Sequence, residues 1–229
     1  ADYALEERMA KNKLTVNEFI KNLLEPSMEF AKKDVADVYA FAKKNGFEDS
    51  QLQSWDFSYW SEKYQQAEYS LSAEELKPYF QLESCIDAVL GLATRLYGIT
   101  FKELDNVPVY HPDVKVYEVN DADGRHLALF YADFFPRASK RGGAWMTEFR
   151  GQSIRNGVEY RPFISTVMNF TKPTADAPAL ITHDELVTFL HEFGHALHGI
   201  FAEGRYGSLT GTNVSRDFVE LPSQIMENW

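Results

Sequence analysis

Two histidines four residues apart, with a glutamate directly after the first, constrain the fold of this chain more than any other feature. His191, Glu192 and His195 lie within residues 182–201, where apolar residues recur at helical spacing. Residues four apart lie one turn apart on one face of a helix, so both imidazoles can reach one ion. Glu192 lies about 100° round the helix from His191, near such an ion but poorly placed to bind it. We therefore predict a metal-binding helix in which Glu192 acts as general base.

The start and the burial of this helix follow from its flanking residues. Thr182, followed three residues later by Glu185, forms a capping box and predicts where the helix begins. A surface helix would carry Lys and Glu opposite its apolar stripe. Here Glu192 is the only charged residue between Glu185 and Glu203, so we expect a buried helix. Because an uncompensated buried carboxylate is costly, a bound cation explains the segment better than a core helix with incidental histidines.

A catalytic zinc ion usually has three protein ligands and a water molecule, so two histidines leave one ligand to be found. His198 lies two turns after His191, about 10 Å along the same helix, which is too far to share the ion. The third ligand is then expected to be a carboxylate on a following helix. We choose Glu220, because apolar neighbours on both sides favour an inward-facing side chain. The carboxylates considered are Glu203, Asp217, Glu220 and Glu227.

Two of the other carboxylates are predicted to support the site. Asp217 and Glu227 recur with Glu220 at spacings of three and seven residues, on one face of a helix predicted over residues 216–229. Carboxylates in such positions orient metal-binding histidines through hydrogen bonds. A solvated helix face is the alternative interpretation of both residues. The predicted cofactor is one zinc ion per chain.

The composition of the chain disfavours some classes of binding partner and favours one cellular compartment. The 229 residues carry 23 basic and 34 acidic side chains, a net charge of −11. This charge disfavours nucleic acids and anionic membrane surfaces as partners. The single cysteine, Cys85, excludes a disulfide within the chain and is compatible with a reducing compartment. Without a recognisable signal peptide or membrane span, we expect a cytoplasmic protein; the sequence makes no prediction of its oligomeric state.

The first part of the chain, residues 1–105, has helical patterns throughout, and we predict a helical subdomain there. Thr15–Glu18 is a capping box and Asn45-Gly46 is a helix stop. Pro26, which lies between them, should kink or divide this segment. Ser72 is expected to open a later helix.

Residues 106–229 differ in character. Four strands are expected in two pairs, the second pair joined around Asn156-Gly157. Pro162 implies that the last strand starts late or lies at an edge. The four strands are Val114–Val119, Arg125–Tyr131, Ala144–Arg150 and Tyr160–Phe170. The predicted fold class is α+β, mainly α with a small β-sheet, and residues 106–229 form a catalytic domain that looks truncated after Trp229.

Around these residues the sequence resembles a known family. His191–His198, followed by Arg216–Gln224 and Glu227–Trp229, is similar to the thimet oligopeptidase family of zinc metallopeptidases. Ser208–Asn213 and Lys140–Met146 most resemble its peptidyl-dipeptidase (dipeptidyl carboxypeptidase) branch. The two ligand motifs at this spacing carry most of the resemblance, which covers most of the chain.

The resemblance implies a zincin-like HExxH helix within a mostly helical, two-lobed peptidase. It assigns zinc binding to His191, His195 and Glu220, and the base to Glu192. The strand at Ala144 and Trp145 would pair with the backbone of an oligopeptide substrate. Family members also use Tyr and His residues that follow the third ligand, and this chain ends before them. We therefore expect a fragment that has weak or no activity alone.

The predicted function is zinc-dependent hydrolysis of peptide bonds in oligopeptides, with release of C-terminal dipeptides. Two alternatives stay open. One is an endo-acting oligopeptidase of the same family. The other is a non-catalytic helical binding module that keeps the fold but holds no metal.

Overall fold

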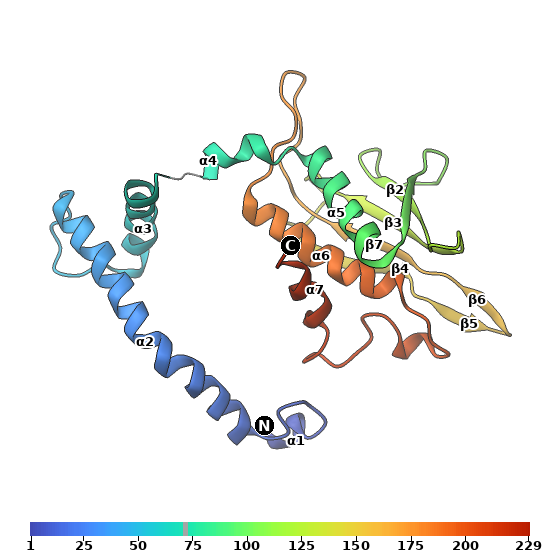
Figure 1. Cartoon of the computed structure of the whole chain (residues 1–229), viewed down its shortest axis with the longest axis horizontal. Coiled ribbons are helices and arrows are strands. Elements are labelled where there is room, and N and C mark those ends of the chain that lie inside the picture. The colour runs from blue at the N-terminus through green and yellow to red at the C-terminus, as the bar shows by residue number, and fades with distance from the viewer. Residues whose placement is uncertain (71–72) are drawn as a thin grey trace. The chain divides into compact units, whose positions relative to one another are not determined.

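The structure, a computed structural model, describes residues 1–70 and 73–229, which divide into two compact units. The first unit comprises Ala1–Glu75 and the second Leu76–Trp229 (Figure 1). Helices together with a small mixed sheet confirm the predicted α+β class. The predicted domain boundary at residue 105 stays a prediction. The contacts themselves separate the chain between Glu75 and Leu76, because the residues that follow pack with the sheet.

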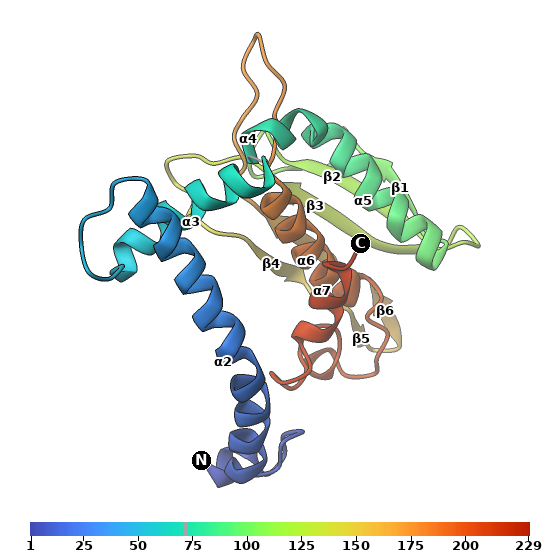
Figure 2. The same ribbon diagram turned by 60° about the vertical axis from the view of Figure 1, so that its left-hand side comes forward.

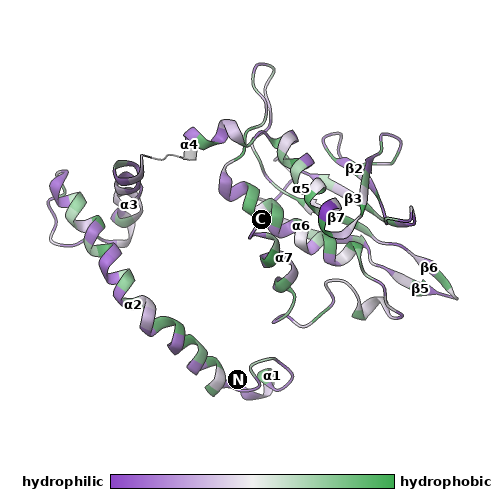
Figure 3. Cartoon of the chain, in the orientation of Figure 1, coloured by the Kyte–Doolittle hydropathy of each residue, from purple (hydrophilic) through white to green (hydrophobic). Residues whose placement is uncertain are grey.

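Within the described residues, the first unit is built of helices. The last of these, α4, begins in the first unit and ends at Leu76, the first residue of the second unit. Val38 and Ala42 of α2 are buried and Phe41 packs edge-on against Trp60 of α3, with ring centroids 6.4 Å apart. The first half of α2 carries apolar residues among polar ones and is exposed (Figure 3). The expected helix start at Ser72 lies outside the described residues. The helices are α1 (Asp2–Leu5), α2 (Lys13–Lys44), α3 (Ser54–Tyr69) and α4 (Ala73–Leu76).

Helix α2 corrects two expectations. It begins before the predicted capping box, because the Asn12 side chain accepts the N–H groups of Leu14 and Thr15. Pro26 does not divide the helix, which is continuous to Lys44. The carbonyl of Asn22 loses its N–H partner at Pro26, but Asn22 is exposed and water can replace the bond.

Five strands of the second unit form a mixed sheet in the order β1-β2-β3-β7-β4. β3 and β7 are parallel, and the other neighbours are antiparallel. β4 therefore lies at one edge, with one side paired to β7 and the other free of strands. The strands are β1 (Thr100–Glu103), β2 (Lys115–Asn120), β3 (His126–Asp133), β4 (Trp145–Arg150) and β7 (Phe163–Val167).

The sheet differs from the prediction in two details and agrees with it in a third. Asn156 and Gly157 form the turn of a separate hairpin instead of connecting β4 directly to β7. This hairpin consists of β5 (Ser153–Arg155) and β6 (Val158–Tyr160). β7 starts late, directly after Pro162, which agrees with the first of the two alternatives predicted for this strand, and it lies inside the sheet. β1 lies within residues 1–105, which were predicted to be helical. The strand was missed because its pairing with β2 is a contact that the local sequence pattern does not show.

Helices α5 (Leu82–Tyr97) and α6 (His183–Ile200) pack on one face of the sheet (Figure 2). Phe130 and Ile164 of the sheet meet Phe189 and Phe193 of α6 in one buried core. Helix α7 (Glu220–Met226) packs against α6, and two 3₁₀ turns, η1 (Lys77–Tyr79) and η2 (Gly207–Leu209), complete the unit. No helix in the described part of the chain is both long and apolar enough to cross a lipid bilayer.

Candidate metal centre

Helix α6 presents both histidines of the predicted site on one face. It starts at the predicted capping box, in which Thr182 Oγ1 accepts the N–H of Glu185 and the Glu185 carboxylate accepts the N–H of Thr182. The rings of His191 and His195, one turn apart, have centroids separated by 5.0 Å. Burial of the helix face opposite them in the core of the unit fixes the direction in which they point.

Glu220, at the first residue of α7, completes a cluster of three ligand groups. Its Oε2 lies 3.3 Å from Nε2 of His191 and 3.1 Å from Nε2 of His195. The three ligand atoms all lie within 4.8 Å of one another. Two imidazole nitrogens and a carboxylate oxygen are a donor set that suits zinc and leaves a position for water.

Close packing of α7 on α6 brings Glu220 to the histidines. Gly194 lies at the crossing, where a Cβ atom would come 2.5 Å from the carbonyl oxygen of Pro222 and 2.6 Å from Cα of Ser223. Any larger residue would hold the helices further apart. Ser223 is fully buried, and its Oγ lies 2.9 Å from Oε2 of Glu220. The sequence interpretation missed Ser223, although a serine three residues after a helical ligand is a recognisable signal.

Glu227 lies where the predicted orienting carboxylate should be. Its Oε1 is 2.6 Å from Nδ1 of His191. A carboxylate at Nδ1 favours the proton on that nitrogen, which leaves the Nε2 lone pair directed at the cluster. His195 differs, because its Nδ1 is buried and has no hydrogen-bond partner among the described residues.

Asp217 is placed differently from the prediction. Helix α7 begins at Glu220, not near Arg216, and Asp217 belongs to the turn that precedes it. The shared helical face assumed for Asp217, Glu220 and Glu227 is therefore wrong for Asp217. Pro222 falls at the third position of α7, where its missing N–H costs no helical hydrogen bond. An orienting role for Asp217 stays a prediction.

Glu192 is buried between α6 and the edge strand, with 8% of its surface exposed. Burial raises the pKa of its carboxyl group, although the nearby His191 and the backbone N–H of Met146 in β4 both oppose the rise. The interaction of Met146 with Glu192 was not foreseen, although the resemblance places the strand at Ala144 and Trp145 along the substrate. A cavity of about 330 Å³ beside Glu192 is lined by both predicted substrate-binding residues, Ala144 and Trp145.

The pKa shifts of His195 and Glu220 suit the binding of a cation. Burial lowers the pKa of His195, which favours the neutral imidazole. Burial alone would raise the pKa of Glu220, but the Ser223 hydroxyl and the two histidines together lower it and favour the carboxylate. His198 lies outside the cluster, as predicted, with its ring centroid 6.2 Å from that of Phe218.

Comparison with known proteins covers the whole chain. The sequence pattern of peptidase family M3 matches residues 1–229. The chain is 43% identical over 232 residues to the dipeptidyl carboxypeptidase of Salmonella typhimurium and 40% identical over 228 residues to oligopeptidase A of Escherichia coli. It is 41% identical over 235 residues to a probable cytosolic oligopeptidase A of Arabidopsis thaliana. These alignments include 98% or more of this chain but only 33–34% of each relative, so the chain spans about a third of their length.

Proposed function

The chain belongs to peptidase family M3, and from that premise we propose that it forms the zinc-binding part of an enzyme that hydrolyses oligopeptides. The observation that carries the proposal is the cluster of His191, His195 and Glu220, whose ligand atoms lie within 4.8 Å of one another. A buried glutamate beside three such ligands is the arrangement that metal-assisted hydrolysis requires. The names of the relatives support peptides as substrates.

In the proposed reaction each residue has a separate task. His191, His195 and Glu220 would hold the zinc ion, which would supply polarisation of the peptide carbonyl and activation of water. Glu192 accepts the proton from the attacking water and returns it to the leaving amine. The raised pKa of Glu192 suits this exchange, because a base works best when its pKa lies near the working pH. The backbone N–H of Met146 favours the carboxylate form and so limits the rise of this pKa.

Substrate handling is proposed for the free edge of β4. An extended peptide can add to an edge strand through main-chain hydrogen bonds. Ala144 and Trp145 lie at the start of that edge and line the cavity that contains His191 and Glu192. A peptide held there would have its backbone beside the metal cluster. This placement supports substrate binding at Ala144 and Trp145.

Release of C-terminal dipeptides is the finer proposal, and the similarity to a dipeptidyl carboxypeptidase supports it. The similarity to oligopeptidase A supports endo-acting cleavage as the second candidate. Products from one peptide with a free and with an amidated C-terminus would distinguish them, since dipeptide release requires the free carboxylate. A cytoplasmic location is proposed on the single cysteine and on the name of the Arabidopsis relative.

Metal analysis tests the core of the proposal. We expect the purified chain to hold one zinc ion, and His195→Ala and Glu220→Ala variants to hold far less at the same free zinc concentration. Equal zinc in all three proteins would contradict the proposed site and favour a binding module without metal. Circular dichroism of each variant shows whether the fold is retained.

A further inference from the structure

A second cavity, of about 360 Å³, lies on the sheet face that is turned away from α6. Ala144, the residue before β4, and Met146 of β4 pack against the core that α6 covers. Side chains alternate along a strand, so Trp145 and Thr147 face the other way, and both line this second cavity. Trp145 also lines the cavity of the metal cluster. The two cavities are therefore neighbours across the edge strand.

The second cavity is positively charged in a chain that is strongly acidic. Arg137, Lys140 and Arg141 line it, and Asp133 is the only acidic residue among its lining residues. This leaves a formal excess of two positive charges, whereas the chain as a whole carries −11. Such a local reversal of charge attracts anions.

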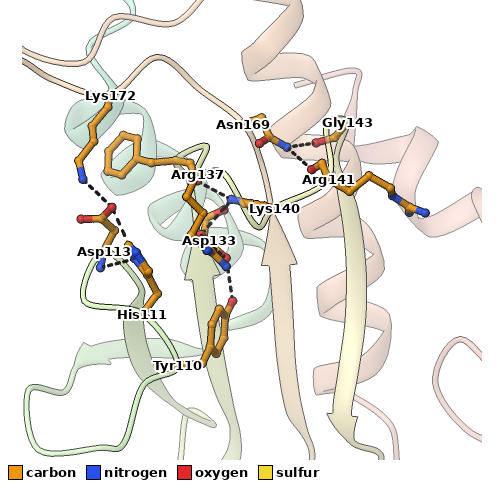
Figure 4. Close-up of polar contacts among 11 residues, drawn as sticks. Tyr110, His111, Asp113, Asp133, Arg137, Lys140, Arg141, Gly143, Asn169 and Lys172 are labelled. Atoms are coloured by element: carbon orange, nitrogen blue, oxygen red, sulfur yellow. Dashed lines mark hydrogen bonds and ion pairs between the residues drawn. The ribbon is translucent and has the colours of Figure 1, made fainter.

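Asp133 is a buried carboxylate that pairs with two of the cations lining the cavity, Arg137 and Lys140. It is 1% exposed and lies at the end of β3. The Nζ of Lys140 donates to a carboxylate oxygen and the carbonyl of Asp133 and to the carbonyl of Phe135, at 2.8–3.0 Å. Nη1 of Arg137 lies 3.0 Å from both carboxylate oxygens of Asp133, and the Tyr110 hydroxyl donates to one of them (Figure 4). Lys140 uses all three of its N–H donors in these bonds, and together the bonds fix the loop that follows β3.

Arg137 and Lys140 pair with Asp133, whereas Arg141 is the cation of this loop that has no bond to Asp133. Its guanidinium lies over the ring of Trp145, 5.2 Å from the centroid, and the residue is exposed. Within residues 1–70 and 73–229 no carboxylate pairs with this guanidinium. Its backbone is nevertheless fixed, because Asn169 Nδ2 donates to the carbonyls of Arg141 and Gly143 (Figure 4). An unpaired guanidinium on a fixed backbone is preorganised to bind an anion.

The position of the cavity indicates which anion it receives. A peptide along the free edge of β4 keeps its main chain in the plane of the sheet and sends alternate side chains to opposite faces. A peptide residue opposite Trp145 or Thr147 has its side chain on the face of the second cavity, while its neighbours face the metal cluster. A C-terminal carboxylate would lie in the line of the strand instead. The anion that reaches Arg141 is then a side chain.

We propose that this cavity is a subsite for an acidic side chain of the bound peptide and that Arg141 is its specificity-determining residue. The inference rests on the proposed function, because it requires a peptide on β4. It adds the substrate class: peptides with Asp or Glu next to a residue that faces the metal. Neutral side chains would leave the guanidinium without an anion.

Binding of matched peptides tests this subsite. Dye-labelled peptides that carry Glu or Gln at each position in turn are titrated by fluorescence anisotropy against the zinc-loaded chain bearing Glu192→Gln, which prevents hydrolysis. At one position we expect the Glu peptide to bind roughly tenfold more tightly than the Gln peptide, the effect of one charge-assisted hydrogen bond. Arg141→Gln should reduce this ratio to about one. Arg205→Gln is the matched control, because Arg205 also lies over an aromatic ring, that of Tyr206, and is exposed.

The outcomes separate this inference from the proposed function. Equal binding of Glu and Gln peptides at every position, or no binding of any Glu peptide, overturns the subsite. A preference that Arg141→Gln leaves intact also overturns it. A preference that is lost when the peptide C-terminus is amidated would assign the carboxylate to the terminus and contradict a side-chain subsite. Failure of the proposed function would instead appear as a wild-type chain that binds no zinc.

Discussion

Oε1 of Glu227 lies 2.6 Å from Nδ1 of His191, on the side of the imidazole away from Glu220. From this contact we expect Glu227 to hold the ring orientation of His191 and to favour the tautomer with the proton on Nδ1. We predict that Glu227→Ala lowers zinc affinity about 10- to 100-fold while the fold is kept. Competition with a chromophoric chelator measures the affinity.

Glu203→Ala is the control for Glu227→Ala, since Glu203 is an exposed carboxylate just beyond the end of α6. Its zinc affinity should equal that of wild type. Equal affinities for all three proteins would mean that Glu227 does not orient His191. A loss shared by both variants would indicate a general effect of charge.

Gly194 sets the distance between α6 and α7, the two helices that carry the proposed zinc ligands. An alanine there would bring its Cβ within 2.5 Å of the Pro222 carbonyl oxygen, so α7 must move. We predict that Gly194→Ala lowers the free energy of unfolding by about 1–3 kcal/mol, as overpacking does, and also weakens zinc binding because Glu220 is displaced. Urea unfolding and chelator competition measure the two effects.

Gly91→Ala is the matched control, because Gly91 also lies in a helix but a Cβ there would meet no atom within 4 Å. This change should leave zinc affinity unaltered and raise the free energy of unfolding by about 0.5–1 kcal/mol, the usual gain of alanine over glycine in a helix. Equal stability losses in both variants would argue against a special role for the crossing at Gly194.

The helix that carries the histidines could be predicted closely because its signals are local. The capping box at Thr182 and the apolar period specify a start, a length and a buried face without reference to the rest of the chain. Glu220 was chosen on similar grounds, and the structure brings it to both histidines. Its role as a zinc ligand stays a proposal. Its position beside the histidines could be predicted because it requires only a turn and a second helix after α6.

Several features that depend on contacts between distant strands were not predicted. The parallel pairing of β3 with β7 and the bond from Met146 to Glu192 join segments more than 30 residues apart. A single sequence shows which residues prefer strands but not which strands pair. The start of α7 was also missed, because the turn before Glu220 has the same local composition as a helix.

Arg161 anchors the end of α6 to the sheet. Its guanidinium donates to the carbonyls of Leu127, Ile200 and Ala202 at 2.8–2.9 Å. Its charge also complements the negative end of the helix dipole. Arg161 reaches these carbonyls with three different nitrogens, Nε, Nη1 and Nη2. Lysine keeps the charge but has one nitrogen, which cannot lie at all three places, so we predict that Arg161→Lys lowers the free energy of unfolding by about 2–3 kcal/mol. Arg155→Lys, on the exposed hairpin, should change it by less than about 0.5 kcal/mol. Similar values for the two variants in urea unfolding would contradict the anchoring role.

Glu148 gives the fold a dependence on pH that is separate from the metal cluster. Its carboxylate is half-buried, and a Cβ on Gly211 would lie 2.8 Å from its Oε1. Burial raises the pKa of Glu148, so between its unfolded and its folded pKa the folded chain holds more protons than the unfolded chain. The contribution of Glu148 to stability is therefore fully present below the unfolded pKa and is lost as pH rises through the folded pKa. Glu148→Gln removes this loss, and we predict that the variant is more stable than wild type at pH 7 but not at pH 4. Thermal unfolding across that range measures the difference, and a constant gap between the two proteins would contradict a titrating Glu148.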